Sequence, residues 1–140
     1  MKKAILLTAI AAITLTACGA SGTKSKDKQA AATEQAAIEQ GTLRVYSFHG
    51  DQRCITCRAI EKLAKEVVAE LKNDNIDLKV INISDKANEA LADKYEVTWS
   101  SLVLDNGKTA NNVTEMAFSY AKNQPDVFKK NLKAEIAKLL

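Results

Sequence analysis

Two cysteines separated by two residues are the side chains of this sequence best suited to chemistry. They are Cys54 and Cys57, with Ile55 and Thr56 between them. A cysteine thiolate attacks disulfide bonds, and one helical turn brings two cysteines at this spacing close together. The pair can therefore alternate between two free thiols and an internal disulfide. We expect Cys54 to be the exposed nucleophile and Cys57 to be the more buried thiol that resolves a mixed disulfide.

The residues around the pair favour an ionised Cys54. The apolar spacing that follows predicts a helix that begins close to Cys54, and the free N–H groups at a helix N-terminus favour negative charge. Arg53 and Arg58 add positive charge nearby. His49, the one histidine of the chain, either buffers protons near the site or is simply exposed at the surface.

Metal binding is the alternative chemistry for the same residues. A structural zinc ion usually takes four ligands, and only His49 could join the thiolates of Cys54 and Cys57. A covalently attached haem would need a histidine where Arg58 stands. Soft thiolates select Cu(I), so the two cysteines with His49 could bind Cu(I) or arsenite. The sequence has no glycine-rich phosphate loop, and we expect no bound organic cofactor.

The third cysteine lies in a separate pattern at the N-terminus. A basic Met-Lys-Lys start precedes residues 4–17, an uncharged run that would span only about 21 Å as a helix. This is too short for a bilayer core of about 30 Å and is typical of a signal peptide. Residues 15–18 read Leu-Thr-Ala-Cys and resemble the lipobox of bacterial lipoprotein precursors. That resemblance implies removal of residues 1–17 and lipidation of Cys18.

Export would place the remaining cysteines outside the cytosol, where disulfides persist. We expect the chain to be lipid-anchored to the bacterial cell envelope, facing the periplasm, with residues 18–40 as a flexible polar tether. The full sequence carries 20 Lys+Arg and 17 Asp+Glu, and the charge falls to +1 once the two N-terminal lysines are removed. Because no basic cluster is present, we expect no nucleic-acid partner.

Residues 41–140 alternate between strand and helix patterns. Apolar and polar residues alternate along 43–48, whereas apolar residues recur every three or four positions between 60 and 71. The region 76–83 predicts a second, more fully buried strand. Asp105-Asn106-Gly107-Lys108 predicts a two-residue hairpin turn. The remaining predictions are strands at 101–104 and about 109–113, and helices from about 86 to 95, at 115–122 and from Pro125 onward.

This order of elements resembles a thioredoxin-like domain. A strand, a Cys-x-x-Cys turn, a long helix, a parallel strand, a helix and an antiparallel hairpin follow one another, and a right-handed crossover makes the first two strands parallel. The stretches 80–85 and 95–97 are also similar to thioredoxin. The resemblance implies an α/β fold over residues 41–140, with a central mixed sheet of about four strands flanked by helices.

The sequence departs from thioredoxin at the site itself. Thioredoxins carry a cis-proline that faces the dithiol, and Ser101 stands in that loop instead. Arg53 replaces the usual tryptophan, and Ser47 replaces a buried acid of the first strand. Trp99 flanks the loop and either packs at the rim of the core or offers a partner a docking platform.

With these departures, the sequence resembles small exported proteins of the ArsF-type (nitrophenyl compound nitroreductase subunit) family of Bacteroidetes-type bacteria. The sequence therefore predicts a membrane-tethered thiol–disulfide oxidoreductase or electron-transfer protein, whose partner is a protein dithiol or disulfide in the envelope. A protein that binds Cu(I) or arsenite is the first alternative, and a lipid-anchored scaffold with a purely structural disulfide is the second. The direction of electron flow and the oligomeric state are left open.

Overall fold

Strand β1, Leu43–His49, is the first regular element of the computed structural model, which describes residues 41–140. The predictions for residues 1–17, Cys18 and the tether lie outside these described residues. Within them, no helix combines the length and the apolar character that crossing a bilayer requires.

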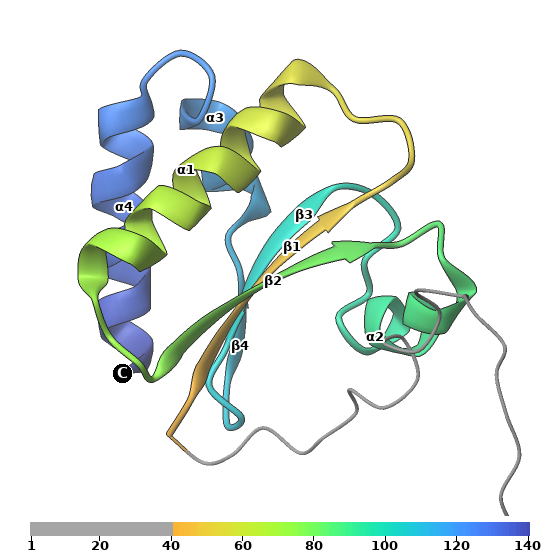
Figure 1. The fold of residues 1–140 in the computed structure, drawn as a ribbon, viewed down its shortest axis with the longest axis horizontal. Helices are drawn as coiled ribbons and strands as arrows, with labels where there is room; N and C mark the ends of the chain where they lie inside the picture. The colour runs from red at the N-terminus through yellow and green to blue at the C-terminus, as the bar shows by residue number, and fades with distance from the viewer. Residues whose placement is uncertain (1–40) are drawn as a thin grey trace, which may run out of the picture.

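β1 lies inside a four-stranded mixed sheet of order β2-β1-β3-β4. It pairs in parallel with β2, Ile76–Asn82, and antiparallel with β3, Ser101–Asp105, which in turn pairs with β4, Ala110–Asn112. The parallel connection passes through α1, Ile55–Leu71, as predicted for a crossover. Figure 1 shows α1 packed across one face of the sheet.

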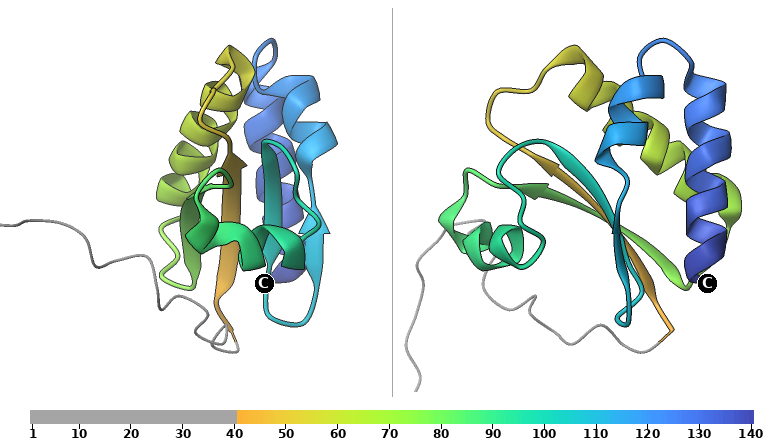
Figure 2. Two further views of the ribbon diagram at one scale, coloured as in Figure 1. Left: turned by 90° about the vertical axis from the view of Figure 1, so that its right-hand side faces the viewer. Right: turned by 180° about the vertical axis from the view of Figure 1, so that it is seen from behind.

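Helices cover the two faces of the sheet unequally. α1 shares one face with α3, Thr114–Tyr120, and α4, Pro125–Leu139. The opposite face carries α2, Glu89–Lys94, which follows a short 3-10 helix at Lys86–Asn88 (Figure 2). The expected α/β arrangement of a mixed sheet flanked by helices is therefore confirmed.

The alternation along β1 decides which side chains reach each face. Leu43 and Val45 point into the larger core with α1, α3 and α4, whereas Tyr46 and Phe48 point to the face that α2 covers. Because successive side chains of a strand alternate, one seven-residue strand supplies both cores.

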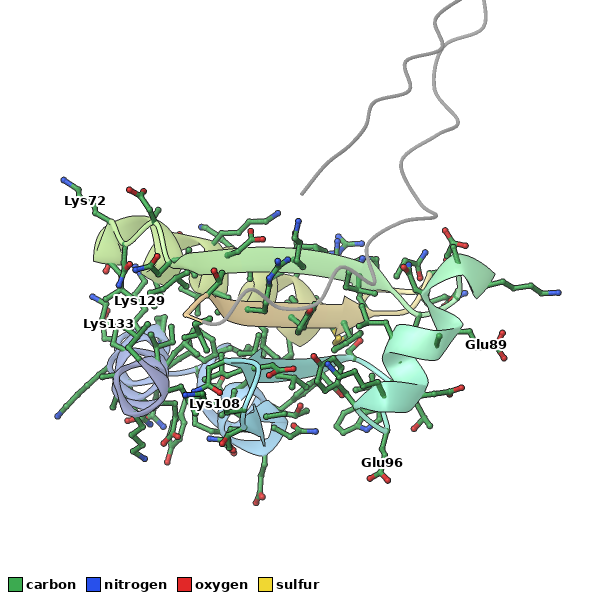
Figure 3. All side chains as sticks on the ribbon, turned by 90° about the horizontal axis from the view of Figure 1, so that it is seen from below. Lys72, Glu89, Glu96, Lys108, Lys129 and Lys133 are labelled. Carbon is green, nitrogen blue, oxygen red and sulfur yellow. A yellow bond between two sulfur atoms is a disulfide. The ribbon has the colours of Figure 1, made fainter. Side chains whose placement is uncertain are left out.

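α4 is built on a stripe of residues spaced by four. Pro125 occupies its first turn, where the missing N–H costs nothing. Phe128, Leu132 and Ile136 are almost completely buried against α1, α3 and the sheet. Lys129 and Lys133 lie on the α4 side of the molecule (Figure 3). Lys129 bridges α4 to α1, since its Nζ lies 2.6 Å from Glu66 Oε2. That pair is partly solvent-exposed, so the apolar stripe supplies most of the stability.

Two predictions about the sheet are wrong. β2 is not the more fully buried strand, because only Ile76 of its residues is buried. In the described part of the chain β2 pairs with β1 alone and forms an edge of the sheet. The hairpin loop is also longer than two residues, spanning 106–109. Side-chain oxygens of Asp105 and Asn106 accept the N–H groups of Gly107, Lys108 and Thr109 at 2.7–3.0 Å and stabilise the longer loop.

The end of β3 is joined to α2 by a buried carboxylate. Asp105 Oδ2 accepts hydrogen bonds from the Tyr95 hydroxyl at 2.5 Å and from Lys94 Nζ at 3.2 Å. Burial favours the neutral acid, but the hydrogen bonds from Tyr95, Gly107 and Lys94 outweigh it and lower the pKa of Asp105 below its ordinary 3.8.

Stability is therefore expected to fall in acid because of Asp105. A lowered folded-state pKa stabilises the fold above the unfolded value of 3.8, and this stabilisation is lost as the pH falls through the folded value. Urea unfolding of wild type and Asp105→Asn, measured between about pH 5 and pH 2, should show a weaker pH dependence in the variant. Asp74→Asn, an exposed position, is the control and should follow wild type. An Asp105→Asn curve parallel to that of wild type would contradict this assignment.

Candidate redox site

The first cysteine of the pair caps helix α1. Cys54 has extended backbone angles (φ −71°, ψ 163°), and its Sγ accepts a hydrogen bond from the backbone N–H of Cys57 at 3.0 Å. The Cys54 carbonyl accepts the first helical hydrogen bond, from the Arg58 N–H at 3.1 Å. The sulfur atom thus occupies the place that an oxygen takes in an ordinary helix N-cap.

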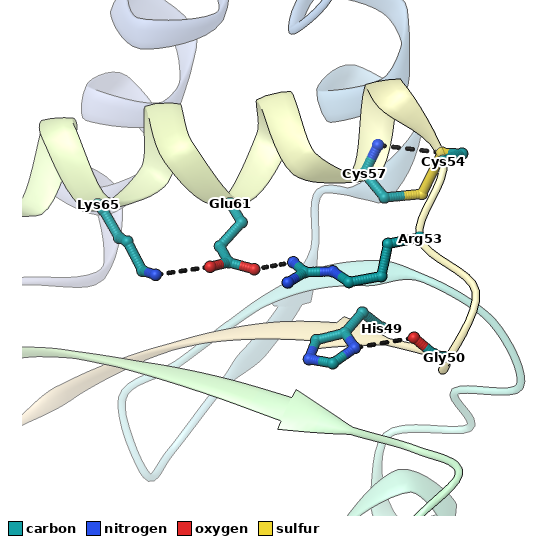
Figure 4. A network of polar contacts seen from close by, with 7 residues as sticks. All are labelled: His49, Gly50, Arg53, Cys54, Cys57, Glu61 and Lys65. Carbon is teal, nitrogen blue, oxygen red and sulfur yellow. Dashed lines mark hydrogen bonds and ion pairs between the residues drawn. A yellow bond between two sulfur atoms is a disulfide. The ribbon is translucent and has the colours of Figure 1, made fainter.

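A disulfide joins Cys54 and Cys57, whose Cα atoms are 5.2 Å apart (Figure 4). Cys54 is exposed, whereas Cys57 is partly buried. In the reduced protein, the N–H that points at Cys54 Sγ and the helix dipole would both favour a thiolate at Cys54. The first turn of α1 holds no acidic residue that would oppose this effect.

Glu61, an acidic residue that the sequence analysis did not single out, neutralises much of the charge of Arg53. The Arg53 guanidinium forms an ion pair with Glu61, and the same carboxylate lies 2.5 Å from Lys65 Nζ. Figure 4 shows this chain of contacts running along α1 beside the disulfide. The only signal in the sequence is the Glu61–Lys65 spacing of four on the polar face of the helix. Arg53 therefore offers Cys54 less positive charge than its position in the sequence suggests.

Arg58 is the exposed cation beside the nucleophile. It lines a surface hollow together with Asp51, Gln52, Arg53 and Cys54. Among residues 41–140, no carboxylate lies within ion-pair distance of its guanidinium. The structure thus brings Arg58 and Cys54 to one hollow.

His49 and the dithiol are not brought together as one ligand set. The His49 Nδ1–H donates to the Gly50 carbonyl oxygen at 2.9 Å, which fixes the tautomer because a carbonyl only accepts. In the region from 41 to 140, no three His, Cys, Asp or Glu side chains are grouped closely enough to hold a metal ion.

Ser101 lies near the dithiol, as the resemblance implies. Cys57, Ser47, Ser100 and Ser101 help to line a cavity of about 10 Å³, close to the volume that a single water molecule needs. No acid lines this cavity, so hydroxyl groups take the place of a buried carboxylate behind Cys57. The Ser101 hydroxyl itself donates to the Trp99 carbonyl at 3.1 Å.

Trp99 is an exposed aromatic residue next to Ser101 and Phe118. Its side chain is 56% exposed, and its ring lies 5.1 Å from the ring of Phe118, which lines the same small cavity as Cys57. The structure thus places Trp99 at the rim. A half-exposed tryptophan held by a second aromatic ring is also suited to contact a partner.

Solved structures with the same arrangement of elements place the site in a known fold. No family model matches the chain, and no curated protein matches it. The thioredoxin of Fasciola hepatica has 22% sequence identity and a TM-score of 0.52, over 72% of this chain and 84% of that protein. Trxlp from Edwardsiella tarda EIB202 has 18% identity and the same TM-score, over 70% of this chain and 88% of that one. The chain therefore has an α/β thioredoxin-like fold, with its cysteine pair at the start of α1.

Proposed function

We propose that the protein is a thiol–disulfide oxidoreductase whose redox-active groups are Cys54 and Cys57. The observation that carries the proposal is the position of Cys54 as the N-cap of α1, where its Sγ accepts the Cys57 N–H at 3.0 Å. A thiolate gains more from this contact than a thiol does. The greater exposure of Cys54 and the thioredoxin-like fold also support the proposal.

The exchange needs only the two cysteines and a substrate disulfide. The Cys54 thiolate attacks one sulfur of the substrate, forming a mixed disulfide and expelling the other sulfur as a thiolate that takes up a proton. The Cys57 thiolate then attacks Cys54 Sγ, which expels the first substrate sulfur and leaves the Cys54–Cys57 disulfide. Two electrons pass from the protein dithiol to the substrate, and the reverse sequence oxidises a substrate dithiol.

We propose that this activity takes place at the cell envelope. The Leu-Thr-Ala-Cys stretch at 15–18, which resembles a lipobox, supports the proposal of a lipid anchor at Cys18. We further propose that the domain faces the periplasm and that its partner is a protein dithiol or disulfide. Arg53, Ser101 and Trp99 support the narrower proposal that the chain is related to the ArsF-type family. Cu(I) or arsenite binding by Cys54 and Cys57 is the competing function.

The pKa of the Cys54 thiol tests the carrying observation. Alkylation of the reduced protein by iodoacetamide, followed site by site with mass spectrometry across pH, should show a Cys54 pKa at least about one unit below the free value of 8.5. Cys57→Ala serves as the control. Of the pair it keeps only the Cys54 thiol, so the inflection in its alkylation rate against pH belongs to Cys54. A Cys54 pKa near 8.5 would count against an activated nucleophile.

A further inference from the structure

The hollow beside Cys54 has an excess of positive charge. We call it the arginine hollow; its volume is about 560 Å³, and Asp51, Gln52, Arg53, Cys54 and Arg58 line it. The nucleophilic sulfur is thus part of its wall. A substrate disulfide that reaches Cys54 must bring its neighbouring residues to this surface.

The single carboxylate of the arginine hollow does not neutralise its cations. Asp51 Oδ1 accepts a hydrogen bond from the side-chain amide of Asn82 at 2.8 Å and forms no ion pair with Arg53 or Arg58. Arg53 is paired with Glu61, outside the hollow. Arg58 therefore presents the uncompensated charge.

Positive charge continues along α1 from the arginine hollow. An adjoining hollow of about 380 Å³ shares both arginines, and its lining has four basic residues against two acidic ones. Glu61 pairs with Arg53 and Lys65, and Glu66 lies 3.9 Å from Lys62 and 2.6 Å from Lys129. These pairs offset part of the positive charge, but the basic residues remain in excess and Arg58 is outside all of them, so an incoming carboxylate meets a net positive surface.

A third hollow, beside Trp99 and Phe118, has a different character. It is lined by one carboxylate, Glu115, and by no basic residue, and its Phe118 also lines the small cavity next to Cys57. Among these three hollows, only the two that Arg58 lines contain basic residues. This asymmetry gives the site a means to distinguish substrates by charge, because opposite charges speed encounter and like charges slow it.

Resting on the proposed exchange activity, we propose that Arg58 selects substrates whose reacting cysteine is flanked by aspartate or glutamate. The substrate class is a disulfide in an acidic protein segment. Its carboxylates lie against Arg58 while Cys54 attacks the adjacent sulfur. The exchange itself is unchanged, and Arg58 acts as a specificity-determining residue.

Three short peptides of equal length provide the test. Each carries one cysteine in a mixed disulfide with 5-thio-2-nitrobenzoate, flanked by two glutamates, two glutamines or two lysines. The second-order rate of release by the reduced protein should be about tenfold higher for the acidic than for the basic peptide at low salt. The ratio should shrink toward one in about 0.5 M salt, because exposed charges are then screened.

Arg58→Glu should abolish or invert the acidic preference, and Arg58→Gln should leave an intermediate ratio. Lys130→Glu is the matched control, since it makes the same charge change at an exposed position of α4 and should keep the wild-type ratio. Equal rates for acidic and basic peptides in wild type, or an unchanged ratio in Arg58→Glu, would overturn the proposal. If none of the three peptides reacts faster with the wild-type protein than with Cys54→Ala, the exchange activity on which this proposal rests would be refuted instead.

Discussion

Cys57→Ala is expected to stop thiol–disulfide exchange after its first step. Cys54 keeps its place at the N-cap of α1 and attacks the substrate, but no second thiol remains to attack Cys54 Sγ. A mixed disulfide should therefore accumulate to about one per protein molecule. Intact-mass spectrometry of the variant mixed with a peptide disulfide measures this adduct, and dithiothreitol should release it.

Cys54→Ala supplies the matched comparison. Without the exposed sulfur, the rate of exchange should fall by at least about 10³-fold, as when other covalent nucleophiles are removed. Cys57 is left as the only thiol of the pair, partly buried behind the first turn of α1. An adduct that forms as fast on Cys57 in this variant as on Cys54 in Cys57→Ala would reverse the assigned roles.

Phe128→Ala is expected to cost the largest share of folding free energy. Phe128 is 0% exposed and packs in the core that joins α1, α3 and α4 to the sheet. Truncating a buried phenylalanine leaves a cavity and typically costs about 3–5 kcal/mol, much of the total stability of a small domain. Urea unfolding followed by circular dichroism measures the loss.

Phe118→Ala is the control for this cavity. Phe118 is only partly buried and its ring lies tilted against that of the exposed Trp99, so its truncation should cost clearly less than that of Phe128. A loss below about 1.5 kcal/mol for Phe128→Ala would show that the α4 stripe is not the main support of the core.

The helices and strands could be predicted because the spacing of apolar residues along the chain is a local property of the sequence. The alternation along β1 and the four-residue spacing from Phe128 to Ile136 are present in the sequence before any contact forms. The position of Cys54 at a helix start follows from the same periodicity. These signals were sufficient for the fold and for the cysteine pair.

The errors concern contacts that depend on the whole structure. The burial of β2 depends on how many neighbouring strands pair with it, and its apolar composition does not report that number. The length of the hairpin loop is decided by the side-chain oxygens of Asp105 and Asn106, which compete with a tight turn. Local sequence contains both residues but does not show which N–H groups they reach.

The same limit applies to the charges of the site. Arg53 and Arg58 look equivalent in sequence, yet the path of the loop after β1 brings Arg53 to Glu61 and leaves Arg58 exposed in the arginine hollow. The Arg53–Glu61 partners are eight residues apart and meet only on the folded backbone, so the sequence alone could not separate the two arginines. His49 bonds to its neighbour Gly50 and is not grouped with the cysteines, which the sequence also does not show.

The most direct test of the account is to express the full chain with Cys57→Ala in the organism's own cells and isolate it under non-reducing conditions. The proposed exchange predicts a protein bound covalently to Cys54 and released by reductant, with no such species on Cys54→Ala. The opposite result is the absence of any covalent species, together with tight stoichiometric uptake of Cu(I) or arsenite by the wild-type protein. That result would contradict thiol–disulfide exchange as the function of the Cys54–Cys57 pair.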